Sequence, residues 1–388
     1  MFLDIHALHT LPYSNVNRDG LGSPKSCIYG GAQRIRVSSQ SWKRAARLAV
    51  ENQIGAPTLR TRQIAVRLSE KLREQSWGAD DARRAGRAVV HAYGLSPEDD
   101  NDITNVLLWL PANVLTDLAD VANEHRELIT KLPLPVLGED GKAKKLTKGQ
   151  KAARDTAIAD AVLELREPVT AILNGSNPTI ALLGRMLADA PDHTVDGATQ
   201  VAHAFTVHEA APDFDYFTAV DDLAPNSGAG HLATAEFAAG TFYRYCTINI
   251  TQFYGQVGDL ETALAVVSAW ARTFLTVVPS GKQNSTAART VPDLAYLAIR
   301  EAPLSLAGGF ERPIVTSSNG YVDQAVETLN KYTQRLHQFL SDSGKWSGHA
   351  GTTTAQTPAL GTTFSSLNDL IKQSAEKSRE SMLFEAKS

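Results

Sequence analysis

Hydrophobic and polar residues alternate at the start of the chain. Residues 1–10, "MFLDIHALHT", have the period of a β-strand, and "QRIRV" at 33–37 repeats it. This alternation places Arg34 and Arg36 on one face and Ile35 and Val37 on the other. Between the two strands, residues 13–31 are rich in Gly, Asn, Ser and Pro, which predicts a loop.

The period changes to that of a helix directly after the second strand. Ser38 or Ser39 is a suitable N-cap. The expected buried stripe follows the spacing of one helix face and consists of Trp42, Ala45, Ala46, Ala49 and Val50. We expect the opposite face to carry Gln40, Lys43, Arg44 and Arg47.

The middle of the chain is predicted to be mainly helical from 52 to 175, with breaks near Pro111 and Pro133. A short helix follows in "NPTIALLGRMLADAP" and is expected to end at Pro191. The segments "TQVAHAFTVHE" and "GTFYRYCTINI" alternate as strands. The long segment between them, rich in turns and small residues, predicts an extended hairpin arm.

The last third predicts a mixture of elements. A helix at 259–277, capped by Asp259, precedes a polar loop, and "DLAYLAIREAPLSLA" has the character of a strand region. A helix at about 321–341, a Ser-, Gly- and Thr-rich linker at 342–363 and a helix at 366–384 complete the prediction. The fold class expected from the whole pattern is α+β.

Composition is typical of a globular protein able to bury a core. The 388 residues are 43% hydrophobic and 21% charged, and no window approaches the ~18 apolar residues of a membrane span. The N-terminus lacks the basic region of a signal peptide. Cys27 and Cys246 lie far apart, which fits a reducing cytoplasm and excludes a disulfide scaffold or a thiolate zinc site.

Positive charge is concentrated in one short segment of an acidic chain. The net charge is -4, yet 30–47 contains no acid and five cations: Arg34, Arg36, Lys43, Arg44 and Arg47. A strand that leads into a Ser-capped helix presents free backbone N–H groups, which with the helix dipole attract phosphate. The segment therefore predicts a nucleic-acid backbone site; the alternative is an ordinary solvated helix face.

Several motifs in and beyond this segment resemble one known family. They are "NRD", Lys25, "GG" and "RIRVSSQSWKRAAR", followed by "GRM", "VAHAFTVH", "YFTAVDDL", "FYRY" and "VPSGKQ". Their order resembles the guide-RNA-binding backbone subunit of type I-E CRISPR Cascade, the CasC family of the RAMP superfamily. The resemblance runs from residue 1 to about 300, and the remainder matches only loosely.

The resemblance implies a right-hand shape made of three parts. A modified RRM, ferredoxin-like palm would comprise 1–51, 179–205 and 241–340. Helical fingers would occupy 52–178 and an extended hairpin thumb 206–240, and a C-terminal linker and helix would follow at 341–388.

The resemblance also implies a function in antiviral defence. Copies of such a subunit polymerise along one CRISPR RNA, kink it at intervals and present its bases for pairing with target DNA. The implied partners are CRISPR RNA, further copies of the chain, other Cascade subunits and target DNA. No enzymatic activity, cofactor, metal or membrane is implied, and the expected location is the cytoplasm.

Site residues follow from the same resemblance. Those expected to hold the RNA backbone are Arg18, Lys25, Ser38, Gln40, Lys43 and Arg47, with Arg34 and Arg36 from the basic segment. Met186 would pack against bases near the kink; the alternative is a core methionine. Contacts from the far side of the palm would come from Lys282, Gln283, Asn284 and Ser285, for which the alternative is an ordinary polar loop.

A second basic run opens a predicted helix. Lys142, Lys144, Lys145 and Lys148 precede any acid in that stretch. Because a Cascade complex must also hold duplex DNA, we expect them to contact DNA phosphates; the alternative is a solvated loop.

Three other activities have weaker support in the sequence. "VPSGKQ" imitates a P-loop, but Thr276 and Gln283 occupy positions that require Gly and Ser or Thr. The residues His203, His208, Asp213 and Asp215 match no zinc template. The rival function is a metal-dependent RNA endonuclease that acts through Asp19, although a salt bridge or a turn explains Asp19 equally well. A further alternative is a scaffold that interacts only with proteins, which would assemble without RNA.

Overall fold

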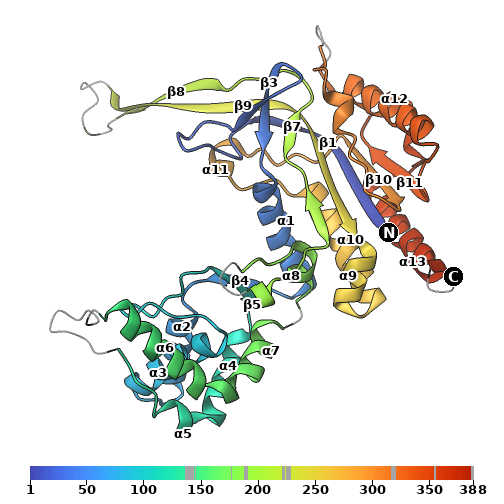
Figure 1. Ribbon diagram of the computed structural model, residues 1–388. Helices are drawn as coiled ribbons and strands as arrows, with labels where there is room; N and C mark the ends of the chain where they lie inside the picture. Colours follow the sequence, from blue (N-terminus) through green and yellow to red (C-terminus); the bar gives the residue numbers. More distant parts are fainter. Residues whose placement is uncertain are drawn as a thin grey trace. The chain divides into compact units, whose positions relative to one another are not determined.

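The structure is a computed structural model that describes residues 1–135, 144, 146–175, 177–187, 191–220, 223, 229–315, 320–353 and 355–385. The chain divides into two compact units (Figure 1). Met1–Ile54 with Ala198–Ser388 form the sheet unit, and Gly55–Gly197 form the helical unit. The expected α+β class is confirmed. The fingers were expected over 52–178, whereas the compact helical unit continues to Gly197.

The sheet unit is built on one large mixed sheet. Among the described residues its strands run in the order β12-β11-β10-β1-β9-β7-β3-β2, and β6 and β8 also pair with β9. Their bounds are β1 Phe2–Ser14, β2 Ser26–Tyr29, β3 Ala32–Val37, β6 Thr199–Val201, β7 Ala204–Thr206, β8 Asp213–Val220, β9 Ala229–Asn249, β10 Leu294–Arg300, β11 Trp346–Gly351 and β12 Thr362–Thr363.

Alternate residues of β9 face two different cores. Phe242 packs with Ile35 and Trp42 on the face covered by α1 (Ser39–Ile54) and α10 (Leu260–Thr276), and α13 (Leu367–Glu385) packs beside α10. Tyr243 packs with Leu329 of α12 (Val322–Leu340) on the other face. The period of two along the strand thus produces a three-layered unit.

The expected hairpin arm is present. Residues of β8 pair antiparallel with the first half of β9, from Asp213 opposite Phe237 to Val220 opposite Ala229. Figure 1 shows this ribbon projecting from the sheet. The remaining elements of the sheet unit are α9 (Ile250–Val257) and the single turn α11 (Gln283–Thr286).

The buried stripe of α1 differs from the expected one. Trp42, Ala46 and Val50 are buried, but Ala45 and Ala49 are only half-buried. Arg47, expected on the opposite face, is buried and forms an ion pair with Glu51 at 2.9 Å. The carboxylate one turn later neutralises the guanidinium, which allows a charged side chain to enter the core.

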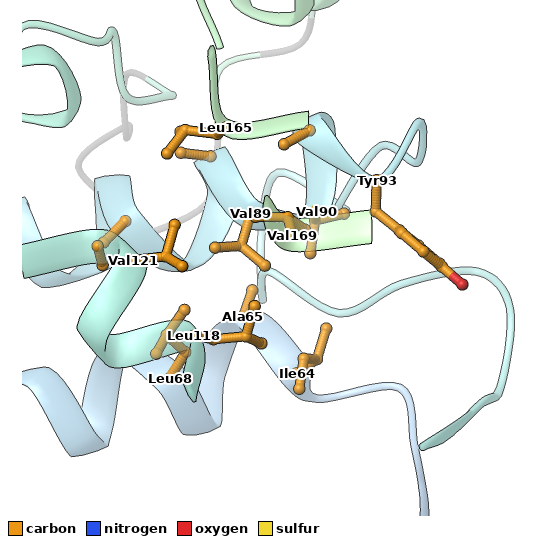
Figure 2. Packing of buried hydrophobic residues seen from close by; sticks show 14 of the residues in the cluster. Ile64, Ala65, Leu68, Val89, Val90, Tyr93, Leu118, Val121, Leu165 and Val169 are labelled. Atoms are coloured by element: carbon orange, nitrogen blue, oxygen red, sulfur yellow. The ribbon is translucent and has the colours of Figure 1, made fainter. Parts of the chain in front are cut away.

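The helical unit confirms the prediction for the middle of the chain. Its helices are α2 Ile64–Glu74, α3 Ala79–Ala92, α4 Val114–Glu124, α5 Arg126–Ile129, α6 Lys148–Ala161, α7 Leu163–Leu173 and α8 Pro178–Leu183. Figure 2 shows how Leu68, Val89, Leu118 and Leu165 converge from different helices on one core. The pairing of β4 (Thr58–Thr61) with β5 (Leu108–Pro111) was not expected.

Two expected elements are wrong. Helix α8 ends at Leu183 instead of continuing to Pro191, because Gly184 adopts φ +79, outside the helical region. The expected linker at 342–363 contains β11 and β12, and β11 extends the central sheet by pairing with β10. By contrast, Asp259 caps α10 as expected, since its Oδ2 accepts the N–H of Thr262 at 2.7 Å.

Burial of His6 predicts a pH-dependent stability of the sheet unit. Burial, and secondarily Arg300, lower its pKa from 6.5 to about 3. The unfolded chain therefore binds a proton that the folded chain excludes, and stability falls as pH decreases from 6.5 towards 3. We expect wild type to lose about 2 kcal/mol more than His6→Gln between pH 7 and pH 5. Urea denaturation at both pH values measures this difference; equal losses would contradict it.

Candidate nucleic-acid interface

The loop after β1 connects the start of α1 to the hairpin arm. Asn17 Oδ1 accepts the N–H of Ser38 at 2.8 Å, and the Asn17 carbonyl accepts the N–H of Lys25 at 3.0 Å. Asn15 Nδ2 donates to the carbonyls of Gly22 at 2.9 Å and Glu236 at 2.8 Å. The loop is therefore held in a fixed conformation between the two elements.

The expected cap of α1 is confirmed. Ser38 Oγ accepts the N–H of Ser41 at 3.4 Å. The Ser41 N–H also donates to the Ser38 carbonyl at 3.0 Å. The start of a helix carries the positive end of the helix dipole, which favours an anion at this end of α1.

Two hollows beside α1 form one continuous surface, here called the α1 groove. The first is lined by residues 16–22 and Gly281. The second, a cavity of about 600 Å³, lies between α1 and the segments 276–281 and 289–291. Val16 and Gly281 line both hollows, so the loop after β1, the outer face of α1 and the segment 276–291 share one concave surface.

Four exposed cations surround the α1 groove. Arg18 lines the first hollow, Arg44 and Arg289 line the second, and Lys282 follows Gly281 directly. Within the described part of the chain, none of the four forms an ion pair with a carboxylate. The groove can therefore accept several negative charges in succession.

Sequence reasoning missed Arg289 and assigned no role to Arg44. Arg44 belongs to the basic segment, whose density of cations was the available signal. Arg289 lies in a polar loop, and only the return of that loop to α1 brings it to the groove. No local pattern in the sequence encodes this return.

The other cations near the start of α1 are less exposed. Lys43 is half-buried, and burial lowers its pKa. Arg36 donates through Nε to the Ser26 carbonyl at 3.0 Å, and its Nη1 lies 3.1 Å from Nδ1 of His203. Burial and the charges of Arg36 and Lys25 lower the pKa of His203. Gln40, in the first turn of α1, is exposed.

The geometry favours structural roles for two residues expected to bind RNA. Arg34 is 0% exposed and donates to the carbonyls of Thr206 at 2.8 Å, Phe310 at 3.2 Å and Glu311 at 3.3 Å. Arg47 is engaged with Glu51. A phosphate could reach either guanidinium only by breaking these buried contacts.

The loop at 282–285 presents three of its four expected residues to solvent. Lys282, Asn284 and Ser285 are exposed, and Lys282 adopts a left-handed backbone with φ 54. Gln283 is buried, and its Nε2 donates to the carbonyls of Pro279 at 3.1 Å and Ala288 at 3.4 Å. Gln283 thus shapes the loop that displays its neighbours.

The remaining predicted residues belong to the helical unit. Met186 follows Gly184 and is 84% exposed, so the alternative of a core methionine is wrong. Lys144 and Lys148 are exposed, and Lys148 begins α6 behind a capping box formed by Thr147 and Gln150. Lys142 and Lys145 lie outside the described residues.

Asp19 has the contacts of a turn residue. Its Oδ1 accepts the N–H groups of Leu21 at 2.8 Å and Ser23 at 3.0 Å, which organises the loop. No cluster of His, Cys, Asp and Glu among the described residues could hold a metal ion. His208 stacks on Tyr321 with ring centroids 3.6 Å apart, as expected of a packed histidine.

The hairpin arm carries exposed aromatic rings. Phe214 is 70% and Tyr216 61% exposed, and their spacing places both on one face of β8. Aromatic rings of this kind provide stacking surfaces for bases.

Comparison with known proteins decides the family. The profile of the CT1975-like protein family matches residues 3–373. The chain belongs to the CT1975-like protein family. No curated protein sequence matches this CT1975-like chain. Among the described residues, no helix is both long and apolar enough to cross a bilayer.

The chain is also similar to solved structures. A chain of a "CRISPR RNA-guided surveillance complex, pre-nicking" is 40% identical, with a TM-score of 0.85, and the match covers 97% of the CT1975-like chain and 99% of the other. A chain of another CRISPR RNA-guided surveillance complex is 35% identical, with a TM-score of 0.75 and the same coverage.

The close approach of two backbone segments at Gly281 can be tested by substitution in this CT1975-like protein. A Cβ at this position would lie 2.7 Å from the Val16 carbonyl oxygen and 2.9 Å from that of Asn15. We expect Gly281→Ala to lower the free energy of unfolding by about 1–3 kcal/mol, because the two backbones must separate. Urea denaturation measures the loss.

Gly255 provides the matched control. It lies in α9, where an added Cβ would meet nothing within 4 Å. Gly255→Ala should stabilise the protein slightly, since alanine favours a helix by up to about 1 kcal/mol. Equal effects of the two substitutions would show that the close approach at Gly281 does not matter.

Proposed function

We propose that this protein is the non-catalytic backbone subunit of a type I-E CRISPR Cascade complex. In this proposal copies of the chain polymerise along CRISPR RNA, kink it periodically and present its bases for pairing with target DNA in antiviral defence. The observation that carries the proposal is the α1 groove, where Arg18, Arg44, Lys282 and Arg289 are exposed and have no carboxylate partner among the described residues. The similarity to chains of CRISPR RNA-guided surveillance complexes supports it.

Backbone recognition suits this task. Cations and helix N–H groups bind phosphates without reading bases, so they leave the base edges free for pairing. The exposed rings of Phe214 and Tyr216 on the hairpin arm provide a surface on which a displaced base stacks. Met186, exposed in the helical unit, would pack against bases near the kink.

Further partners complete the proposal. The other Cascade subunits would flank the filament in the cytoplasm. Lys144 and Lys148, with Lys142 and Lys145 outside the described residues, would contact phosphates of the target duplex. No cofactor or metal is required by this scheme.

The rival function remains an RNA endonuclease that acts through Asp19. Its carboxylate accepts two backbone N–H groups within its own loop, which favours a turn over catalysis. The absence of catalysis is therefore part of the proposal and needs a direct test.

One assay tests scaffold and nuclease together. The purified chain is incubated with end-labelled RNA of guide length, with magnesium or with EDTA, and resolved on native and denaturing gels. A ladder of shifted species with intact RNA is the expected result. Evenly spaced fragments that require magnesium would support the nuclease, and assembly without RNA would support a protein-only scaffold.

The groove cations predict the salt dependence of RNA binding. Each phosphate contact to a single strand contributes about 0.7 to the slope of log affinity against log salt. The double variant Arg44→Gln, Arg289→Gln should therefore reduce the slope by about 1.4. The control is Arg335→Gln, an exposed arginine of α12 on the opposite face of the sheet, which should leave the slope unchanged. Equal slopes in all three proteins would remove Arg44 and Arg289 from the RNA path.

The basic run predicts a separate effect on target capture. Lys144→Gln with Lys148→Gln should spare guide binding and slow the association of the assembled complex with target duplex, because steering depends on exposed charge. Stopped-flow fluorescence with labelled duplex measures the rate. Loss of guide binding instead would assign these lysines to RNA.

A further inference from the structure

Arg244 joins several elements at the centre of the sheet unit. It lies on β9 opposite Ala7 of β1, is 1% exposed and points to the face covered by α1 and α10. Its Nη1 donates to the Leu275 carbonyl at 3.2 Å and its Nη2 to the Phe274 carbonyl. These carbonyls belong to the last turn of α10, which ends at Thr276. The guanidinium thus caps the negative end of that helix.

The same guanidinium holds α1. Its central carbon lies 3.6 Å from the centroid of the Trp42 ring and 4.7 Å from that of Phe274. Trp42 is buried one residue before Lys43 and two before Arg44, which lines the α1 groove. A cation over an indole face is the strongest of the cation–π pairs.

His9 extends the contact to the far end of the segment 276–291. Arg244 Nη1 lies 2.7 Å from His9 Nδ1. Arginine can only donate, so Nδ1 accepts and the ring proton is on Nε2. Nε2 lies 3.1 Å from the Thr290 carbonyl oxygen and 3.0 Å from Thr290 Oγ1. Thr290 Oγ1 in turn donates to the Thr10 carbonyl at 2.8 Å.

These contacts connect Arg244 to both walls of the α1 groove. One arginine reaches α1 through Trp42, the start of the segment 276–291 through Leu275, and its end through His9 and Thr290. That segment displays Lys282 and Arg289. Among the described residues Arg244 has no carboxylate partner, so its charge is balanced by carbonyls and by the end of α10.

We propose that Arg244 is a positioning residue for RNA binding. It sets the spacing between the cations on α1 and those on the segment 276–291, so that both walls engage phosphates of one strand together. The inference rests on the function proposed above. Arg244 itself does not contact RNA, because it is enclosed by Trp42, His9 and the end of α10.

The decisive variant is Arg244→Met, which keeps the length of the side chain and removes its donors. Arg300→Met is the matched control. Arg300 is also buried in the sheet unit, but it contacts Asp4 at 3.7 Å, Tyr296 at 3.5 Å and His337 at 3.0 Å, none of which belongs to α1 or the segment 276–291. Both variants should lower the melting temperature, as the loss of any buried arginine would.

Only Arg244→Met should change RNA binding by the folded protein. We expect about tenfold weaker affinity for guide-length RNA and a salt slope reduced by about 0.7 for each phosphate that no longer meets a cation. Arg300→Met should keep the wild-type affinity and slope. Wild-type values in folded Arg244→Met, or equal losses in both variants, would overturn the proposal.

Hydrogen exchange separates this inference from the proposed function. Without RNA, Arg244→Met should increase exchange in α1 and in the segment 276–291, whereas Arg300→Met should not. If wild type fails to bind RNA, the proposed function fails whatever the exchange shows. If wild type binds RNA and exchange in these segments is unchanged in Arg244→Met, the positioning role alone fails.

A milder variant covers the case in which Arg244→Met does not fold. Thr290→Val removes the hydroxyl that joins His9 to the Thr10 carbonyl and leaves Arg244 in place. Its effect on RNA affinity should be non-additive with Lys282→Gln, which is on the same wall, and additive with Lys25→Gln, which lies directly before β2. Additive effects in both cycles would contradict the proposal.

Discussion

The pairing of β1 with β9 is the interaction on which the rest of the sheet unit depends. Its register places Ala7 opposite Arg244 and Ile5 opposite Cys246, which decides what each face of β9 meets. A shift by one residue would exchange the two faces. Tyr243 would then point at α1 and α10, and Arg244 at the apolar residues of α12. Correct pairing of two strands more than 200 positions apart therefore precedes any groove.

The cationic side chains discussed above fall into a buried group and an exposed group. Arg34, Arg47 and Arg244 are engaged with carbonyls, a carboxylate and an aromatic ring, all within the sheet unit. Arg18, Arg44, Lys282 and Arg289 remain exposed. A chain of net charge -4 can thus present a basic groove, because the local arrangement of cations governs attraction of a polyanion more than their total number.

The sequence predicted correctly those features that depend on interactions between neighbouring residues. The cap at Ser38, the cap at Asp259 and the hairpin arm each follow from a few neighbouring residues, and all three are present. It failed where the packing of a side chain, or a partner distant in sequence, decides the outcome. Helical spacing predicts Arg47 on the exposed face of α1, whereas the packing of the unit buries it together with Glu51, one turn later. The small residues and weak alternation of "WSGHAG" indicate a linker, whereas pairing with β10 and β12 makes this segment the strand β11.

The candidate site shows the same contrast between features set by neighbouring residues and features set by distant ones. The basic segment revealed one wall of the groove, since its cations are close together in sequence. The other wall comes from the segment 276–291, whose approach to the loop after β1 depends on the missing side chain of Gly281 and whose conformation depends on the buried amide of Gln283. Arg289 therefore had no sequence signal of its own.

The length of β9 has a consequence for the direction of the hairpin arm. One unbroken strand, Ala229–Asn249, forms both half of the hairpin arm and a central strand of the sheet. The strand passes directly from the arm into its pairing with β1, which is regular from Phe2 opposite Asn249 to Leu11 opposite Gly240. Two irregularities lie along the arm: one in β9 between Ala229 and His231, opposite the step from Ala219 to Val220, and one in β1 between Leu11 and Ser14, just before the loop that borders the groove. The irregularity in β1 lies where β9 passes from the sheet into the arm, so the local bend and twist of a bulge set the direction in which the arm leaves the sheet.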